Sequence, residues 1–272
     1  MAEYNYAPPV DQLLRLGEPT QQDWAWYLTL GIGREHASDL LRMVADEELN
    51  EAPGDSPEVW APVHAWRALA ALHVAEVMEP LLLMLDEPDP DDWAMNDLPD
   101  VAARVGPPAV PILARYLAAP PHTGWFSNSA ADSLGKIGAR HPEAREECIA
   151  VVADQLEQFE ENDGDFNGFL LAALMDLKAV EQLPLIERAF AADAIDPMIA
   201  GDWNDVQVEF GLKPPPKRTV PFWLREAHGA RPSAPVDEAA VWQKRVQDRR
   251  AKEKAKRKQQ KALRKKQRKR GK

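Results

Sequence analysis

Residues 163–168, with the sequence DGDFNG, carry oxygen-bearing side chains at the spacing of a calcium-binding loop. If Asp163 is position 1 of an EF-hand loop, Asp165 is position 3, Asn167 is position 5, and a glycine follows at position 6. Such a loop needs a bidentate glutamate at position 12, where this chain has Leu174. Because an apolar helical pattern begins at residue 168, we interpret the segment as the start of a helix.

The other residue types that perform catalysis show no catalytic pattern. None of the 6 histidines has the spacing of a metalloprotease motif, and no serine, threonine or cysteine lies in a nucleophile elbow. Residues 31–33, Gly-Ile-Gly, lack the third glycine and the preceding strand of a dinucleotide site. Cys148 is the single cysteine, which excludes an internal disulfide, and we expect it in the core. We therefore predict a non-enzymatic protein with no metal or cofactor.

The dipeptide Asp-Trp occurs three times, at residues 23–24, 92–93 and 202–203. In one interpretation the aspartate caps a helix and the tryptophan packs against a neighbouring helix, and Asp205 favours this for the third copy. In the other, the tryptophans line an aromatic, acidic groove that holds basic peptides. The candidate partner-binding residues are then Asp92, Trp93, Asp202 and Trp203.

Basic side chains are concentrated at the C-terminal end of the sequence. Residues 241–272 contain 17 lysines and arginines against two acids, a formal charge of +15, so residues 1–240 carry −26 of the total of −11. Blocks of like charge bind polyanions, which predicts contacts to the phosphate backbone of RNA or DNA without sequence reading. The candidate nucleic-acid-binding residues are Lys256, Arg257, Lys258, Lys261, Arg264, Lys265, Lys266, Arg268, Lys269 and Arg270.

The elements that would position these residues follow an apolar pattern that occurs four times along the chain. Apolar side chains stand one, two and five places after Pro80, Pro111, Cys148 and Pro184, and these anchors are 31, 37 and 36 residues apart. Offsets of this kind fall on one helical face, and the spacing is that of a helical repeat. Each anchor helix follows another helix with its own apolar stripe. We expect Leu82, Leu113, Leu134, Leu174 and Ile186 to be buried.

Several residues indicate where helices begin and end. Ser56, followed by a proline and a glutamate, has the pattern of an N-cap, and Pro62 predicts a kink soon afterwards. Gly106 and Gly138 are expected to end helices in the left-handed conformation. Near the N-terminus, Trp24, Tyr27 and Leu28 form a predicted apolar stripe.

The chain is expected to contain four parts. Residues 1–58 form an N-terminal helical cap or degenerate repeat, and residues 59–212 form the repeats. Residues 213–235 are a proline-rich linker, and residues 236–272 form a basic tail that is helical or disordered.

Two runs, AADSLGKIG at 130–138 and AVPILARYL at 109–117, resemble HEAT repeats of the short type found in bilin lyases. The longer runs VWAPVHAWRAL, NGFLLAALMDLKAVEQLPLIERAF and GDWNDVQVEFGL are similar to a bacterial HEAT-like family without an assigned function. The resemblance covers residues 10–212 and implies an all-α fold, an α-α superhelix of stacked helix pairs.

Three functions are compatible with these features. The first is a non-enzymatic scaffold whose acidic repeats bind a basic protein partner. The second is a nucleic-acid- or ribosome-associated protein that acts through the basic tail, and the third is a lyase-type enzyme, as some HEAT-like proteins are. The N-terminus lacks the pattern of a signal peptide, and no window is apolar enough to span a membrane, so we expect a cytoplasmic protein.

Overall fold

The computed structural model of the chain describes residues 4–20, 23–86, 92–119 and 125–214. The chain divides into two compact units, Met1–Leu224 and Arg225–Lys272, and all described residues belong to the first. In these described residues all regular secondary structure is helical and no strand occurs, which confirms the predicted all-α class.

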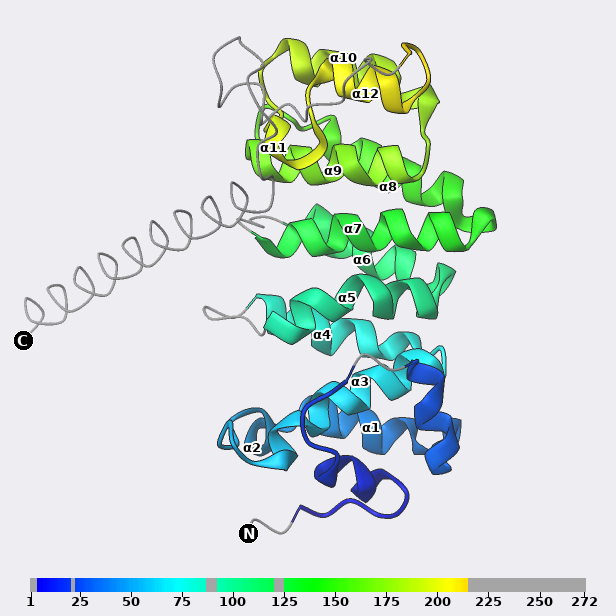
Figure 1. Cartoon of the computed structure of the whole chain (residues 1–272), viewed down its shortest axis with the longest axis vertical. Helices are drawn as coiled ribbons and strands as arrows, with labels where there is room; N and C mark the ends of the chain where they lie inside the picture. The colour runs from blue at the N-terminus through cyan, green and yellow to red at the C-terminus, as the bar shows by residue number, and fades with distance from the viewer. Residues whose placement is uncertain (1–3, 21–22, 87–91, 120–124, 215–272) are drawn as a thin grey trace, which may run out of the picture. The chain divides into compact units, whose positions relative to one another are not determined.

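The helices are labelled in Figure 1. The α-helices are α1 Ala37–Val44, α2 Glu47–Asn50, α3 Ala61–Ala71, α4 Met78–Leu85, α5 Asp92–Val105, α6 Val110–Ala118, α7 Trp125–Arg140, α8 Arg145–Leu156, α9 Gly164–Asp176, α10 Leu183–Ala191, α11 Pro197–Ala200 and α12 Trp203–Glu209. The 3-10 helices are η1 Val10–Arg15, η2 Trp24–Leu30, η3 Arg34–His36, η4 Pro57–Trp60, η5 Ala75–Val77, η6 Pro107–Ala109, η7 Pro142–Ala144 and η8 Val180–Gln182.

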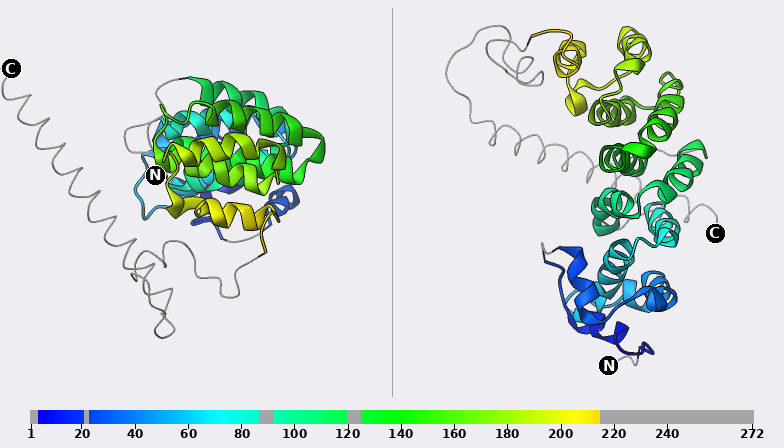
Figure 2. Two further views of the ribbon diagram at one scale, coloured as in Figure 1. Left: turned by 90° about the horizontal axis from the view of Figure 1, so that it is seen from above. Right: turned by 90° about the vertical axis from the view of Figure 1, so that its right-hand side faces the viewer.

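The helix pairs predicted from the recurring apolar pattern are α3 with α4, α5 with α6, α7 with α8, and α9 with α10. In each pair a 3-10 turn, η5 to η8, comes directly before the second helix. The first helices α3, α5, α7 and α9 pack against one another in chain order, and the second helices α4, α6, α8 and α10 do the same (Figures 1 and 2). The same local arrangement therefore occurs four times in the described residues.

The core lies between these two rows of helices. The predicted core residues are buried, and so is the single cysteine, Cys148. Those residues are Leu82, Leu113, Leu134, Leu174 and Ile186. At the N-terminal end, η2 and α1 pack on α3, and α11 packs on α9 further along the chain.

Polar contacts join successive helix pairs at a sequence separation close to one repeat. Lys136 Nζ contacts Asp100 Oδ1, and Arg115 Nη2 contacts Glu79 Oε1, each across 36 residues. An ion pair between Arg188 and Glu157 spans 31 residues. The repeat spacing therefore appears in the polar contacts as well as in the apolar pattern.

The prediction that Gly138 ends a helix was wrong. Gly138 lies inside α7, which continues to Arg140. A Cβ atom at this position would clash with Leu177 and lie 3.3 Å from Cys148 Cβ. The glycine is required because α7 packs closely on its neighbours and not because of a left-handed turn. At Gly106 a helix does end, and its φ of 81° requires glycine, but its ψ of −148° lies outside the left-handed helical region.

Left-handed residues that are not glycine end three other helices. His73, Lys178 and Asp193 have φ values of 55°, 50° and 55°. In each case the next N–H donates to a carbonyl five residues earlier, which is the hydrogen bond of the Schellman motif. These three helix ends therefore cannot be predicted from the positions of glycines in the sequence.

Two expectations near the N-terminus also need correction. The stripe of Trp24, Tyr27 and Leu28 fails at Leu28, which is 39% exposed, because η2 is a 3-10 helix with three residues per turn. Instead of a kink at Pro62, the chain changes from the 3-10 helix η4 to α3 at Ala61, so the proline lies in the first turn of α3. Ser56 stands at the N-cap position, but its side chain makes no capping hydrogen bond.

Candidate partner-binding surfaces

The segment with the spacing of a calcium loop begins α9, as predicted. The Asp163 carboxylate accepts a hydrogen bond from the Phe166 N–H at 2.7 Å and caps the helix. Asn167 is fully buried, and its amide donates to the carbonyls of Phe159 and Ala194 at 2.9 and 2.8 Å. In the part of the chain that the structure describes, no group of three or more His, Cys, Asp or Glu residues could hold a metal ion.

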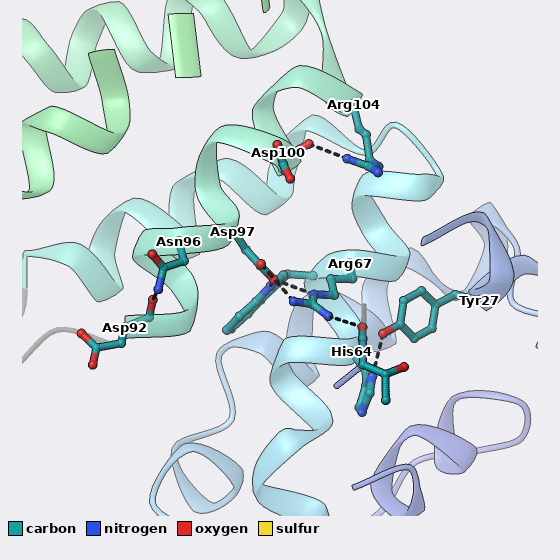
Figure 3. A network of polar contacts seen from close by, with 10 residues as sticks. Tyr27, His64, Arg67, Asp92, Asn96, Asp97, Asp100 and Arg104 are labelled. Atoms are coloured by element: carbon teal, nitrogen blue, oxygen red, sulfur yellow. Dashed lines mark hydrogen bonds and ion pairs between the residues drawn. The ribbon is translucent and has the colours of Figure 1, made fainter. Parts of the chain in front are cut away.

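A buried ion pair between α3 and α5 is the centre of the network in Figure 3. Arg67 Nε and Nη2 donate to the two oxygens of Asp97 at 2.6 and 3.0 Å. The Trp66 Nε1–H donates to Asp97 Oδ2 at 2.9 Å. The side chains of Arg67 and Asp97 are only 8% and 11% exposed. Each charge therefore depends on the other, because water cannot replace a lost partner.

Aromatic rings of two Asp-Trp pairs meet at this ion pair. The Arg67 guanidinium carbon lies 5.2 Å from the centre of the Trp24 ring and 5.4 Å from that of Trp93. Trp93 also packs edge-on against Trp60 at 5.3 Å, and Arg104 stacks on Trp24 at 4.2 Å. These rings join η2 and η4 to α3 and α5, which agrees with the interpretation that the tryptophans pack against neighbouring helices.

The third Asp-Trp pair has the predicted helix cap. Asp202 Oδ1 accepts from the Asp205 N–H at 2.9 Å, and Asp205 Oδ2 accepts from the Asp202 N–H at 3.1 Å. Trp203 packs on Phe190 of α10, with ring centres 5.7 Å apart. Because α7 and α9 lie between α5 and α12 (Figure 1), Trp93 and Trp203 make separate sets of contacts.

His64 joins the N-terminal segment to α3. Its Nε2 lies 2.8 Å from the Gly17 carbonyl oxygen, and its Nδ1 lies 2.7 Å from the Tyr27 hydroxyl. A carbonyl can only accept, so Nε2 carries the proton and Nδ1 accepts from Tyr27. Burial lowers the pKa of His64; the Gly17 carbonyl opposes this effect, and the positive charge of Arg67 adds to it.

The lowered pKa of His64 predicts that the free energy of unfolding falls as the pH drops below about 6.5, the ordinary histidine value. Below that pH the unfolded chain binds a proton that the folded protein does not, until the pH reaches the folded pKa. The slope should be at most about 1.4 kcal/mol per pH unit, the value for one proton. Urea unfolding between about pH 5 and pH 7.5 measures it, and His64→Gln should flatten it. An equal slope in both proteins would assign the effect to other groups.

Carboxylates from four helices form what we call the carboxylate row: Asp100 of α5, Asp132 of α7, Asp176 of α9 and Glu209 of α12. Lys136 lies among them, with Nζ at 2.9 Å from Asp100 and 3.7 Å from Asp132. The pKa of Asp132 is raised by burial and by the negative charges of Asp176 and Asp100, against the opposing effect of Lys136. Burial also raises the pKa of Asp176; Lys136 lowers it, and Glu209 raises it further.

Two of the second helices, α4 and α6, form a groove of about 320 Å³, which we call the α4–α6 groove. Its walls carry both apolar and charged side chains: Glu79, Leu82, Leu83, Asp86, Ile112, Arg115 and Tyr116. Arg115 pairs with Glu79 at 3.2 Å, and the Tyr116 hydroxyl donates to Asp86 at 2.9 Å. Burial and the Asp86 carboxylate raise the pKa of Tyr116, so the hydroxyl stays protonated as a donor.

The sequence analysis predicted neither the carboxylate row, nor the α4–α6 groove, nor the buried ion pair. The sequence does contain signals for the ion pair and for the groove. Arg67 interrupts an apolar stretch, and its partner Asp97 lies 30 residues later, close to one repeat. Leu83 is an extra apolar residue in a helix whose core face is already complete. The ten predicted nucleic-acid-binding residues, and residues 215–272 as a whole, lie outside the described residues.

Comparisons of the chain with protein-family models, with curated proteins and with solved structures gave no match. The likeness to HEAT repeats therefore stays a prediction, and the features above define the class of protein: all-α, with helix pairs that recur along the chain. Among the described helices none is both long and apolar enough to cross a membrane.

Proposed function

We propose that the chain is a non-enzymatic scaffold that binds a basic protein partner through the carboxylate row. Its helix pairs would form a HEAT-like solenoid, since each pair repeats the same 3-10 turn and contacts the next pair at the spacing of one repeat. Such a stack offers side chains from successive helices to one extended ligand.

The carboxylate row is the observation that carries this proposal. Its four acids come from four helices, and one lysine, Lys136, forms ion pairs with Asp100 and Asp132. In addition to burial, the negative charges of Asp176 and Asp100 raise the pKa of Asp132, and that of Glu209 raises the pKa of Asp176. Added positive charge from a ligand would relieve this repulsion and lower the pKa of Asp132 and Asp176.

The spacing of the helices indicates the kind of ligand. Packed helices lie about 8–10 Å apart, and an extended chain advances about 3.3 Å per residue. A lysine or arginine at every third residue of an extended segment would therefore meet successive carboxylates of the row. We infer that the partner presents a basic segment of this kind.

The test is the affinity of the full chain for a labelled 12-residue peptide with lysine at every third position and glycine and serine between. Changing both Asp132→Asn and Asp176→Asn should weaken binding at least about threefold, and Lys136→Gln should strengthen it. The control is Glu160→Gln with Glu161→Gln, which removes the same charge from exposed positions outside the row. Equal losses in the two double variants would show that only net charge matters, which contradicts the proposal.

The same assay distinguishes the nucleic-acid alternative, which rests on the charge of +15 in residues 241–272. A single-stranded RNA replaces the peptide, and contacts to about 6–8 phosphates give a slope of log K against log salt of about −4 to −6. Binding of the RNA but not of the peptide would favour this function. It should then weaken, with a flatter slope, when five tail residues become glutamine: Lys265, Lys266, Arg268, Lys269 and Arg270.

A further inference from the structure

The α4–α6 groove is built from one face of each of its two helices. On one side it is lined by Glu79, Leu82 and Leu83 of α4 and by Asp86, the residue directly after that helix, at the spacing i, i+3, i+4 and i+7. The α6 residues Ile112, Arg115 and Tyr116 have the spacing i, i+3 and i+4. Two helical stripes that line one open groove offer a surface on which a third helix can pack its own stripe.

Leu83 gives this groove an apolar anchor point that the fold does not need. Its residue surface is 67% exposed, whereas the neighbouring Leu81, Leu82 and Leu85 are buried and supply the core face of α4. In a helix with a complete core face, a fourth leucine adds to the cost of exposing apolar surface to water. Covering it with an apolar side chain would remove that cost.

The charges around the groove indicate which charge a helix that binds there should carry. Glu79 is neutralised by Arg115, whereas the side-chain partner of Asp86 within the described residues is the neutral hydroxyl of Tyr116. Asp86, the last lining residue on the α4 side, therefore gives that end of the groove a negative charge. A ligand with positive charge at that end matches it.

From these observations we propose that the α4–α6 groove is a docking site for an amphipathic helix of a protein partner. This helix carries apolar residues at i and i+3 or i+4, which cover Leu83, and lysine or arginine toward Asp86. The groove lies on the second helices α4 and α6, whereas the carboxylate row lies on α5, α7, α9 and α12, so this inference does not rest on the proposed function.

The probe is a labelled 14-residue peptide of leucine and lysine, with leucine at i, i+3, i+4 and i+7, titrated with the full chain at physiological salt. Leu83→Ser should weaken its binding by about tenfold, since an apolar contact at the centre of the groove is lost. Val180→Ser is the matched control, because Val180 is also an exposed apolar residue, at 51%, but lies outside the groove. That variant should bind as the unchanged protein does.

Three results would overturn the inference. One is equal binding by Leu83→Ser and Val180→Ser, with circular dichroism confirming that both are folded. Another is equal binding of a peptide in which glutamate replaces lysine. The third is self-association of the chain that Leu83→Ser abolishes, which would make a second copy the occupant. The variant with Asp132→Asn and Asp176→Asn should still bind this peptide, which separates the groove from the carboxylate row.

Discussion

Replacing Asp97 with alanine should lower the free energy of unfolding by about 3–5 kcal/mol, measured by urea denaturation at neutral pH. The change leaves the Arg67 guanidinium charged and buried, with its side chain only 8% exposed. It also removes the acceptor of the Trp66 Nε1–H. A buried charge without a partner is one of the most costly single defects in a folded protein.

The matched control is Asp100→Ala, three residues further along α5. Asp100 also pairs with a cation on a neighbouring first helix, Lys136 at 2.9 Å, but those side chains are 52% and 41% exposed. Exposed pairs contribute at most about 1 kcal/mol, so this variant should remain close to the unchanged protein. Similar losses in the two variants would contradict the importance of burial.

A double variant separates the ion pair from the packing around it. Arg67→Met with Asp97→Leu removes both charges and keeps apolar volume, and such replacements of buried pairs are often close to neutral. Here the indole of Trp66 still loses its acceptor, which costs about 1–3 kcal/mol. We therefore expect the double variant to be more stable than Asp97→Ala but less stable than the unchanged protein.

The sequence predicted the helix pairs because their apolar residues recur at helical spacing and at the spacing of one repeat. It was least reliable where backbone conformation depends on tertiary packing. Gly138, like Gly106, follows the apolar stripe of a first helix, yet α7 continues through it, and the glycine is needed there because a Cβ would meet Leu177 and Cys148. Lys178 adopts a left-handed conformation without any signal in its residue type.

The candidate surfaces were harder to predict than the fold. The carboxylate row runs from Asp100 to Glu209, so its members are brought together only when successive helices stack. Acids at each of these positions are ordinary on exposed helical surfaces, and no spacing along the sequence distinguishes them. The tryptophans seemed informative because they repeat, yet Trp24 and Trp93 stabilise the surroundings of Arg67.

Replacing Asn167 with leucine should also lower the free energy of unfolding by about 3–5 kcal/mol. The leucine cannot donate to the carbonyls of Phe159 and Ala194, and the Asn162 amide loses the Asn167 oxygen as an acceptor. Each buried polar group without a partner costs about 1–3 kcal/mol. Asn96→Leu is the control, because Asn96 donates to the Asp92 carbonyl from an exposed position, and it should cost less than about 0.5 kcal/mol.

The variant Asn167→Asp tests the same hydrogen bonds through their pH dependence. An ionised carboxylate has no hydrogen to donate and faces two carbonyl oxygens, so burial should raise its pKa in the folded protein above the ordinary value of about 3.9. The folded variant then binds a proton more tightly than the unfolded chain. Its deficit in stability should be largest at neutral pH and shrink as the pH falls through the raised pKa, because the protonated group can donate to one carbonyl.

Comparison with the unchanged protein at each pH removes the effect of His64, which acts in the opposite direction in both proteins. Urea unfolding between about pH 7 and pH 4.5 gives the difference in free energy directly. A difference that stays constant over this range would show that the Asn167 amide does not donate to both carbonyls. The buried asparagine would then not be what joins the start of α9 to the residues after α10.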